Sequence, residues 1–279
     1  MILIADSGST KTHWTVVNGG VIENEVFTEG INPFYQTETE ILHLLQSQLV
    51  FCIDVGTVSQ IYFYGAGCSF DEKKAMVRNA LSVCFGKIII EVESDLLGAA
   101  RGLFQYKSGI ACILGTGSNS CNYDGKTIVN NVSPLGFILG DEGSGAVLSK
   151  VFVADCLKNQ ISEEIITAFF ERYKLTPALI LENVYKKPFP NRYLAQFAPF
   201  LSENIELPAV QTIVKNGFAA FFERNISQYP INLEIGFVGS VAYHLSDVLK
   251  NVADEQNYKV STIVKSPMEG LIQYHTQFQ

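Results

Sequence analysis

The alternation of apolar and polar residues near the start of the chain predicts an antiparallel run of strands. A first strand covers Ile2 to Ala5, and the stretch HWTVVNGGVIENEVF that follows predicts two more strands. The sequence Asn18-Gly19-Gly20 between these two strands is typical of a tight hairpin turn. The chain is therefore expected to open with a meander of three strands.

Helix and strand patterns alternate over the rest of the first half. Apolar residues recur at helical spacing from Glu38 to Leu49, and residues 71 to 84 are again helical in pattern. The stretches QIYFYGAG and KIIIEVE predict strands, and Asp95 opens the predicted helix DLLGAARGLF. The predicted order of this half is β-β-β-α-β-α-β-α.

The same order then begins again. GIACILGTGSNSCNYDGKTIVNNV predicts a strand, a glycine turn and two strands that meet at Asp124-Gly125. Helix signals follow from Gly143 to Asp155 and over residues 161 to 229, and the C-terminal part adds strand, helix, strand and a helix-like end. We therefore predict an α/β fold with two domains on one plan, residues 1–105 and 106–279, and a helical insertion at about residues 155–230.

Composition and charge exclude several classes of partner. The net charge of -8 and the pI near 5.1 argue against a nucleic-acid backbone or an anionic membrane surface as the main partner. The start MILIADSGST lacks a signal-peptide pattern and no apolar run approaches the ~18 residues that span a bilayer, so a cytoplasmic location is expected. The six cysteines show no CxxC spacing, which favours buried free thiols over a zinc site or a disulfide framework. The sequence is compatible with a homodimer and does not decide the oligomeric state.

The corner after the first strand, DSGSTKT, combines glycine, hydroxyl groups and a lysine, which suggests a phosphate site. It is not a Walker A loop, because Thr10 rather than glycine precedes Lys11 and a strand rather than a helix follows. GAGCSF fails the dinucleotide fingerprint, since Phe70 stands where the third glycine belongs. What remains is a hairpin corner that can bind phosphate, with Asp6 at the strand end able to hold a hydrated cation.

A similar corner, LGTGSNS, follows the first strand of the second half. Its glycines allow a ligand to approach the backbone closely, and Thr116 and Ser118 offer hydroxyl donors. Either corner alone is weak evidence, because glycine-rich hairpin turns are common. Together they favour a nucleoside triphosphate bound in the cleft between the two predicted domains.

Four motifs in this order, DSGSTKT, GTGSN, LGDEGSG and FVGSV, resemble those of the actin, sugar kinase and chaperone ATPase superfamily. Within it, the chain resembles the N-acetylglucosamine kinase and BadF/BadG-type ATPase family over essentially its whole length. The resemblance implies two ribonuclease H-like (actin-like ATPase) domains, ATP and Mg²⁺ as cofactors and a small-molecule sugar as substrate. The activity it implies is ATP-dependent phosphorylation of a hexosamine, N-acetylglucosamine or glucosamine, at the 6-hydroxyl.

The family's motifs assign roles to matching residues of this chain. Asp95 corresponds to the family's catalytic aspartate and is the candidate general base, and Asp6 is the candidate Mg²⁺ ligand, acting through water. The expected cofactor-binding residues come from the two corners and from the late GS turn: Gly8, Ser9, Thr10, Lys11, Thr12, Gly115, Thr116, Gly117, Gly239 and Ser240.

Sugar recognition needs amide and carboxylate groups that pair with hydroxyls, because an unpaired buried polar group costs ~1 to 3 kcal/mol. The expected sugar-binding residues, several of them matched through the family, are Asn32, Ser118, Asn119, Gly136 and Asp141. The segment PLGFILGDEGS departs from the family pattern, since Leu135 replaces the tryptophan of vertebrate-like members. This change bears on the contact to the acetamido group.

Two other functions stay open. Some relatives use ATP hydrolysis to activate a partner enzyme by electron transfer, and those carry an iron-sulfur cluster on paired cysteines, which this sequence lacks. A noncatalytic sugar or nucleotide sensor could use the same site. That function is less favoured, because the sequence has no helix-turn-helix segment or basic patch and keeps every acidic residue that catalysis needs.

Overall fold

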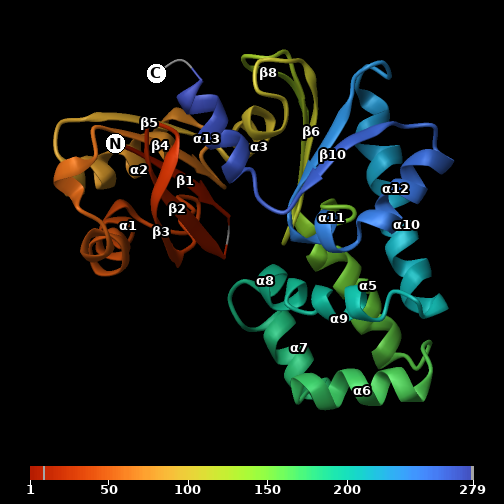
Figure 1. Ribbon diagram of the computed structural model, residues 1–279. Helices are drawn as coiled ribbons and strands as arrows, with labels where there is room; N and C mark the ends of the chain where they lie inside the picture. The colour runs from red at the N-terminus through yellow and green to blue at the C-terminus, as the bar shows by residue number, and fades with distance from the viewer. Residues whose placement is uncertain (9, 278–279) are drawn as a thin grey trace. The chain divides into compact units, whose positions relative to one another are not determined.

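The computed structural model describes residues 1–8 and 10–277, and the chain forms two compact units (Figure 1). Unit 1 contains Met1–Ala111, Tyr123–Val129 and the C-terminal segment that starts at Ser266. Unit 2 contains Cys112–Asn122 and Asn130–Lys265. The domain boundary between residues 105 and 106 stays a prediction.

The first sheet has the strand order β3-β2-β1-β4-β5. β1 pairs antiparallel with β2 and parallel with β4, so the meander expected from the alternation of apolar residues is present. The strands are β1 (Ile2–Ser7), β2 (Lys11–Asn18), β3 (Val21–Glu29), β4 (Gln60–Gly65) and β5 (Ile89–Ser94).

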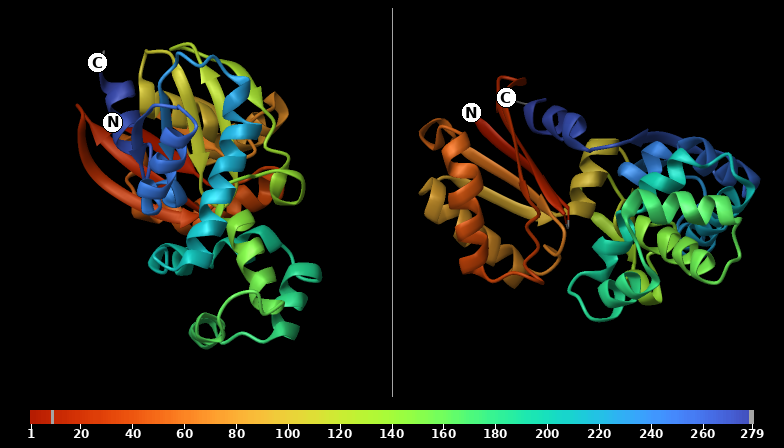
Figure 2. Two further views of the ribbon diagram at one scale, coloured as in Figure 1. Left: turned by 90° about the vertical axis from the view of Figure 1, so that its right-hand side faces the viewer. Right: turned by 90° about the horizontal axis from the view of Figure 1, so that it is seen from below.

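Successive residues of β1 pack on opposite faces of this sheet, because side chains alternate along a strand. Leu3 and Ala5 belong to the core that α1 and α2 cover, whereas Ile2 and Ile4 pack with Leu271 of α13. The ribbons of α2 and α13 lie on opposite faces of the sheet (Figure 2). The helices are α1 (Glu38–Leu44) with a π-helical turn at Leu45–Leu49, α2 (Asp71–Phe85), α3 (Asp95–Phe104) and α13 (Met268–Thr276), with 3₁₀ turns at Val50–Cys52 and Val55–Thr57.

The second sheet repeats the plan of the first. Its order, read as β8-β7-β6-β9-β10, matches β3-β2-β1-β4-β5 strand for strand. The strands are β6 (Gly109–Leu114), β7 (Ser118–Tyr123), β8 (Ile128–Val132), β9 (Ile235–Val238) and β10 (Val260–Val264). The predicted α/β class and the duplicated order of strands are confirmed.

Helices account for most of the rest of unit 2. The rings of Phe221 and Phe222 in α10 contact Phe237 of β9, and an aromatic cluster around Phe169 joins α5, α6 and α9. In the described ranges, every helix is too short or too polar to span a membrane. The helices are α4 (Gly136–Leu139), α5 (Gly145–Leu157), α6 (Glu163–Tyr173), α7 (Pro177–Tyr185), α8 (Pro190–Ala195), α9 (Ala198–Glu203), α10 (Pro208–Arg224), α11 (Ser240–His244) and α12 (Ser246–Glu255), with a 3₁₀ turn at Ile226–Gln228.

The helix that begins with Asp95, α3, packs backbone to backbone against α13. A methyl group added at Gly270 would overlap the carbonyl oxygen of Gly102, and one added at Gly102 would come within 2.9 Å of Pro267. The side chain of Gln105 donates to the carbonyl of Gly270 at 2.9 Å. The close approach of these two helices fixes the axis of α3.

A polar network on the same face of the first sheet holds α13 in place. The hydroxyl of Tyr64 lies 2.8 Å from Nε2 of His275 and accepts a hydrogen bond from Arg101 at 2.8 Å. Arg101 also pairs with Glu91 at 2.5 Å, and the His275 ring stacks on Tyr62 with centroids 3.6 Å apart. Burial, assisted by Arg101, lowers the pKa of His275 to about 3, so the ring is neutral and does not repel the guanidinium.

We expect Gly270→Ala to destabilise unit 1, because the added methyl group must push α13 away from α3. Overpacking of this kind costs about 1–3 kcal/mol of unfolding free energy, although alanine favours helix more than glycine does. The buried Trp14, the only tryptophan of the sequence, reports unfolding by its fluorescence in a urea titration. The control is Gly56→Ala, where the new methyl would meet only the Asp54 carboxylate at 3.4 Å. Equal midpoints for both variants would contradict this account.

Candidate active site

The first predicted phosphate corner lies between β1 and β2. The N–H of Gly8 donates to the carbonyl of Lys11 at 3.0 Å, which closes the corner. Gly8, Thr10 and Lys11 are exposed, and the predicted residue Ser9 lies outside the described residues. Lys11 supplies an ammonium group, which lies 5.2 Å from the centroid of the Phe27 ring, to a turn of a kind that can bind phosphate.

Thr12, the other predicted residue of this corner, is buried and supports it from inside. Its hydroxyl lies 2.7 Å from the hydroxyl of Ser7 and donates to the carbonyl of Glu29 at 3.2 Å. The Ser7 hydroxyl also accepts the N–H of Ile31 at 3.0 Å. These bonds tie the corner to the segment that carries Asn32.

Asn32 is buried in the turn that follows β3. Its side-chain oxygen accepts the N–H of Phe34 at 3.0 Å, and its backbone carbonyl accepts the N–H of Tyr35 at 3.0 Å. Gly67, which follows β4, has φ +81°, and a methyl group added there would overlap the side-chain oxygen of Asn32. The oxygen of Asn32 therefore serves the turn, and its amide nitrogen is left to donate to a ligand.

Two carboxyl groups lie at the carboxyl ends of strands in the first sheet, where ligand sites of α/β proteins form. Burial raises the pKa of Asp6, near the end of β1, to about 7; the charge of Asp95 adds to the rise and Lys11 opposes it. Burial also raises the pKa of Asp95, directly after β5, to about 6, while the N–H of Leu96 donates to its Oδ1 at 2.9 Å. Because Ser94 caps α3 with its hydroxyl, the carboxylate of Asp95 is not needed as a helix cap.

This carboxylate pair fits Mg²⁺ bound together with a phosphate. Mg²⁺ keeps several waters and takes one or two carboxylates plus phosphate oxygens. In the described part of the chain, no group of three or more His, Cys, Asp or Glu side chains could hold a metal. A cation beside Asp6 would also stabilise the charged form of this carboxyl group, which burial and then the charge of Asp95 disfavour. The residues present therefore suit an ion that shares its ligands with a nucleotide.

The second predicted phosphate corner lies between β6 and β7 and is anchored by the start of α5. The N–H groups of Gly145 and Ala146 donate to the carbonyls of Gly115 and Thr116 at 2.8 and 3.1 Å. The N–H of Gly115 donates to the carbonyl of Gly117 at 3.0 Å, which closes the corner. These backbone hydrogen bonds hold the shape of the corner and tie it to the start of α5.

Asp141 is buried beside this corner in the left-handed backbone region, at φ +55°. Its Oδ1 accepts the N–H of Ser118 at 3.2 Å, and a methyl group added at Gly117 would come within 3.0 Å of its Oδ2. Burial raises the pKa of Asp141 to about 6. Its neighbour Glu142 pairs with Nε of Arg224 at 3.0 Å. Asp141 thus has no comparable cation partner among the described residues, although it is the more deeply buried carboxylate.

Asn119 lies in β7, directly after the second corner, and Gly136 lies in the segment that follows β8. The side-chain oxygen of Asn119 accepts from Asn131 at 3.0 Å and from the N–H of Ser120 at 2.9 Å, which leaves its amide group to donate. Gly136 begins α4 with φ +74°, after Leu135 at φ +60°. A leucine in the left-handed region is strained, and its side chain is 60% exposed.

The turn after β9 brings Gly239 and Ser240 to the second corner. Gly239 has φ +126°, and a methyl group added there would overlap the carbonyl of Leu114 and lie 3.3 Å from the N of Gly115. Only glycine allows this approach. Ser240 is the first residue of α11 and does not cap it.

A cavity of about 330 Å³ in unit 2 joins three predicted cofactor-binding residues, Gly115, Thr116 and Ser240. Its volume lies in the range of small-molecule sites. Of its remaining residues, Val241 belongs to the motif FVGSV and His244 and Leu245 follow it closely, whereas the others come from the region of the short helices α8 and α9 and match no motif. The remaining residues are Ala195, Gln196, Ala198, Pro199, Ser202, Glu203, Val241, His244 and Leu245.

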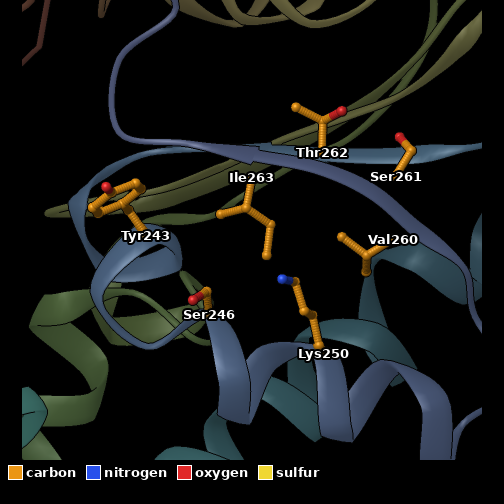
Figure 3. Close-up of a pocket in the computed structure, with 7 residues that line it drawn as sticks. All are labelled: Tyr243, Ser246, Lys250, Val260, Ser261, Thr262 and Ile263. Carbon is orange, nitrogen blue, oxygen red and sulfur yellow. The ribbon is translucent and has the colours of Figure 1, made fainter.

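Another cavity of unit 2, of about 420 Å³, lies between α11, α12 and β10 (Figure 3). It is lined by Tyr243, Ser246, Lys250, Val260, Ser261, Thr262 and Ile263. No predicted site residue is among them. Its larger volume therefore does not make it the site of the predicted chemistry.

No family model matches the chain, and a search of curated proteins found no match. Among solved structures, the chain is similar to a candidate N-acetylglucosamine kinase from Porphyromonas gingivalis, with 48% identity, 99% of both chains covered and a TM-score of 0.97. A candidate N-acetylglucosamine kinase from Chromobacterium violaceum is 16% identical over 98% of both chains, with a TM-score of 0.73. A ROK family glucokinase from Streptomyces griseus, solved with glucose and AMPPNP, is 15% identical over 98% of this chain and 97% of its own, with a TM-score of 0.57.

The two distant similarities establish the fold alone, and it is the fold that the duplicated order of strands already indicated. The similarity at 48% identity spans both units and every motif quoted above. The chain therefore belongs to the same family as this candidate N-acetylglucosamine kinase, and its two-unit fold is that of the actin-like ATPases.

Proposed function

We propose that this protein is an ATP-dependent kinase that phosphorylates a hexosamine, N-acetylglucosamine or glucosamine, at the 6-hydroxyl. The observation that carries the proposal is the pair of Asp6 and Asp95, two carboxyl groups with raised pKa at the strand ends beside a phosphate-type corner. The similarity to the candidate N-acetylglucosamine kinase of P. gingivalis supports the choice of substrate class.

Asp95 acts as the general base. With a pKa of about 6 it is ionised at pH 7 to 8 and still basic enough to accept a proton from the attacking hydroxyl. The N–H of Leu96 holds its Oδ1, which leaves Oδ2 to face the sugar. The backbone contact of α3 with α13 keeps the start of that helix in place.

Asp6 holds Mg²⁺ through water. When bound, the ion neutralises the charge that develops on the transferred phosphoryl group. Lys11 adds a positive charge at the first corner, and those backbone N–H groups that the corners do not use internally are the proposed donors to phosphate. Gly239 and Ser240 support the adenosine, for which the cavity of about 330 Å³ beside Ser240 provides room.

The sugar is held by groups that pair with its hydroxyls. The carboxylate of Asp141 accepts hydrogen bonds, and the amide groups of Asn32 and Asn119 donate them. Ser118 adds a hydroxyl, and Gly136 lets the chain pass close to the ring. Burial disfavours the ionised form of Asp141, and hydrogen bonds from the hydroxyls of a bound sugar would stabilise that form.

The proposed activity is tested by measuring ADP formation with a panel of sugars in the presence of ATP and Mg²⁺. We expect N-acetylglucosamine or glucosamine to stimulate ADP formation and to yield a 6-phosphate. The matched control is the 6-deoxy sugar, which has no acceptor hydroxyl and should give only background hydrolysis. Absence of stimulation by every sugar of the panel would rule the proposal out.

We expect Asp95→Asn to fold normally and to lose activity. Asparagine still accepts the N–H of Leu96, but it cannot take a proton, so kcat should fall by ~10²- to 10⁴-fold with little change in KM. Steady-state kinetics with the best sugar measures the effect. The control is Asp71→Asn, an exposed acid that is likewise the first residue of a helix, α2. A kcat near that of the wild type would remove Asp95 from the mechanism.

We expect Asp141→Asn to lower the sugar-dependent activity without lowering the stability of the protein. Asparagine tolerates the left-handed backbone and keeps the acceptor for Ser118, so the fold is preserved. The pKa of Asp141 rises from 3.8 to about 6 on folding, so the wild type loses stability as pH rises from about 4 to about 6. At pH 7.5 the variant should therefore be more stable by about 1–3 kcal/mol, while sugar-dependent activity falls at least ~10²-fold. Urea unfolding and kinetics measure the two effects; a destabilised variant would show that the carboxylate serves the fold.

A further inference from the structure

Exposed aromatic side chains gather beside Asn32 in unit 1. Phe34 is 53% exposed and Phe70 is 63% exposed. Their ring centroids lie 6.2 Å apart with the planes at 69°, an edge-to-face contact. Single exposed apolar residues are ordinary on a protein surface, but two phenylalanines that contact each other form a patch. We call Phe34 and Phe70 the aromatic pair.

The aromatic pair is connected to a predicted sugar-binding residue by its backbone. The N–H of Phe34 donates to the side-chain oxygen of Asn32 at 3.0 Å. Gly67 lies against both residues, since a methyl group added there would overlap the Asn32 oxygen and come within 3.0 Å of the Phe34 ring. Phe70 follows on the same loop and directly precedes α2. The orientation of Asn32 and the position of the ring are therefore set together.

The loop between Gly67 and Phe70 also lies near the proposed base. Cys68 is buried in this loop, and the charge of Asp95 contributes, after burial itself, to raising the pKa of the Cys68 thiol to about 12. Such an effect requires the two groups to be close, because interactions between charges weaken with distance. β1, β4 and β5 are parallel neighbours, so the loop after β4 emerges at the same edge as Asp6 and Asp95.

We propose that Phe34 and Phe70 contact the sugar and select hexosamines that carry an N-acyl group over those with a free amine. This inference rests on the proposed function. A pyranose ring exposes C–H groups on its faces, and an acetamido group ends in a methyl group. Both bury apolar surface when they lie against an aromatic ring, which gains roughly 25 cal/mol per Å².

The side chain of Lys73 is the reason that the free amine is disfavoured. Its Nζ lies 5.5 Å from the centroid of the Phe34 ring and 3.8 Å from Sδ of Met76, so the ring already has a cation beside it. The amine of a hexosamine is largely protonated at pH 7, and a second ammonium group at this ring would be repelled. A neutral acetamido group meets no such repulsion.

The test compares N-acetylglucosamine with glucosamine at saturating Mg²⁺ and ATP. In the double variant Phe34→Leu, Phe70→Leu, we expect KM for N-acetylglucosamine to rise at least tenfold, while KM for ATP and for glucosamine changes less than threefold. Lys73→Met should lower KM for glucosamine. The matched control is Phe51→Leu, in which an 86% exposed phenylalanine of the same unit is replaced, and it should leave every constant unchanged.

Calorimetric titration with N-acetylglucosamine in the absence of ATP makes the same comparison without turnover. A tenfold loss of affinity in the double variant supports the role of the pair, even if the wild type shows no kinase activity and the proposed function fails. A double variant that binds the sugar like Phe51→Leu overturns the inference while leaving the kinase activity intact. A wild type that uses glucosamine at equal or lower KM overturns the selectivity. Fluorescence of the buried Trp14 checks that each variant is folded. If the double variant does not fold, the single variant Phe70→Leu is measured in its place.

Discussion

Two carboxyl groups of like charge share a desolvated edge of the first sheet, and the structure around them is arranged to keep them there. The pKa of Asp6 is raised to about 7 and that of Asp95 to about 6, so both ionise less readily than an exposed aspartate does. Burial disfavours the charged form of both groups, and the charge of Asp95 adds to this effect on Asp6, so the ionised pair does not stabilise the fold. Perturbed carboxyl groups of this kind are typical of sites where a ligand supplies the missing charge.

Several contacts of unit 1 hold Asp6 and Asp95 at the same edge of the sheet. β1, β4 and β5 run parallel, which brings the ends of β1 and β5 to one edge. Ser94 caps α3, so the carboxylate of Asp95 is free of that task. Gly102 and Gly270 let α13 lie directly on α3, and the network of Tyr64 fastens α13 to the sheet face. Each of these contacts limits the freedom of the helix that begins with Asp95.

Local patterns predicted the strands and the class of fold, because apolar alternation and glycine turns act over a few neighbouring residues. The repeated βββ opening was visible twice in the sequence and is present in both sheets. Features that depend on distant contacts were not visible. The helix expected from Glu38 to Leu49 ends in a π-helical turn, the single helix expected after β9 is broken at Leu245, and α4 was not predicted. Cys52 is exposed, although all the thiols were expected to be buried.

The site residues at the ends of strands could be predicted from the sequence. Those that reach the site only through tertiary packing could not. Asp6, Asp95 and the two glycine corners follow strands directly, so their place in the sequence indicates their place in space. The residues of α8 and α9 that line the cavity beside Ser240 carry no such signal, since only the tertiary fold brings them to the corner. The ion pair of Glu142 with Arg224 was missed for the same reason.

The affinity for ATP with and without Mg²⁺, measured by calorimetry for the wild type and for Asp6→Asn, tests the central claim most directly. Because the carboxylate pair is proposed to be completed by a cation, Mg²⁺ should strengthen ATP binding to the wild type. Asp6→Asn should lose that gain and bind metal-free ATP at least as well as the wild type, since one repelling charge is removed. A variant that retains the full gain from Mg²⁺ would contradict the account.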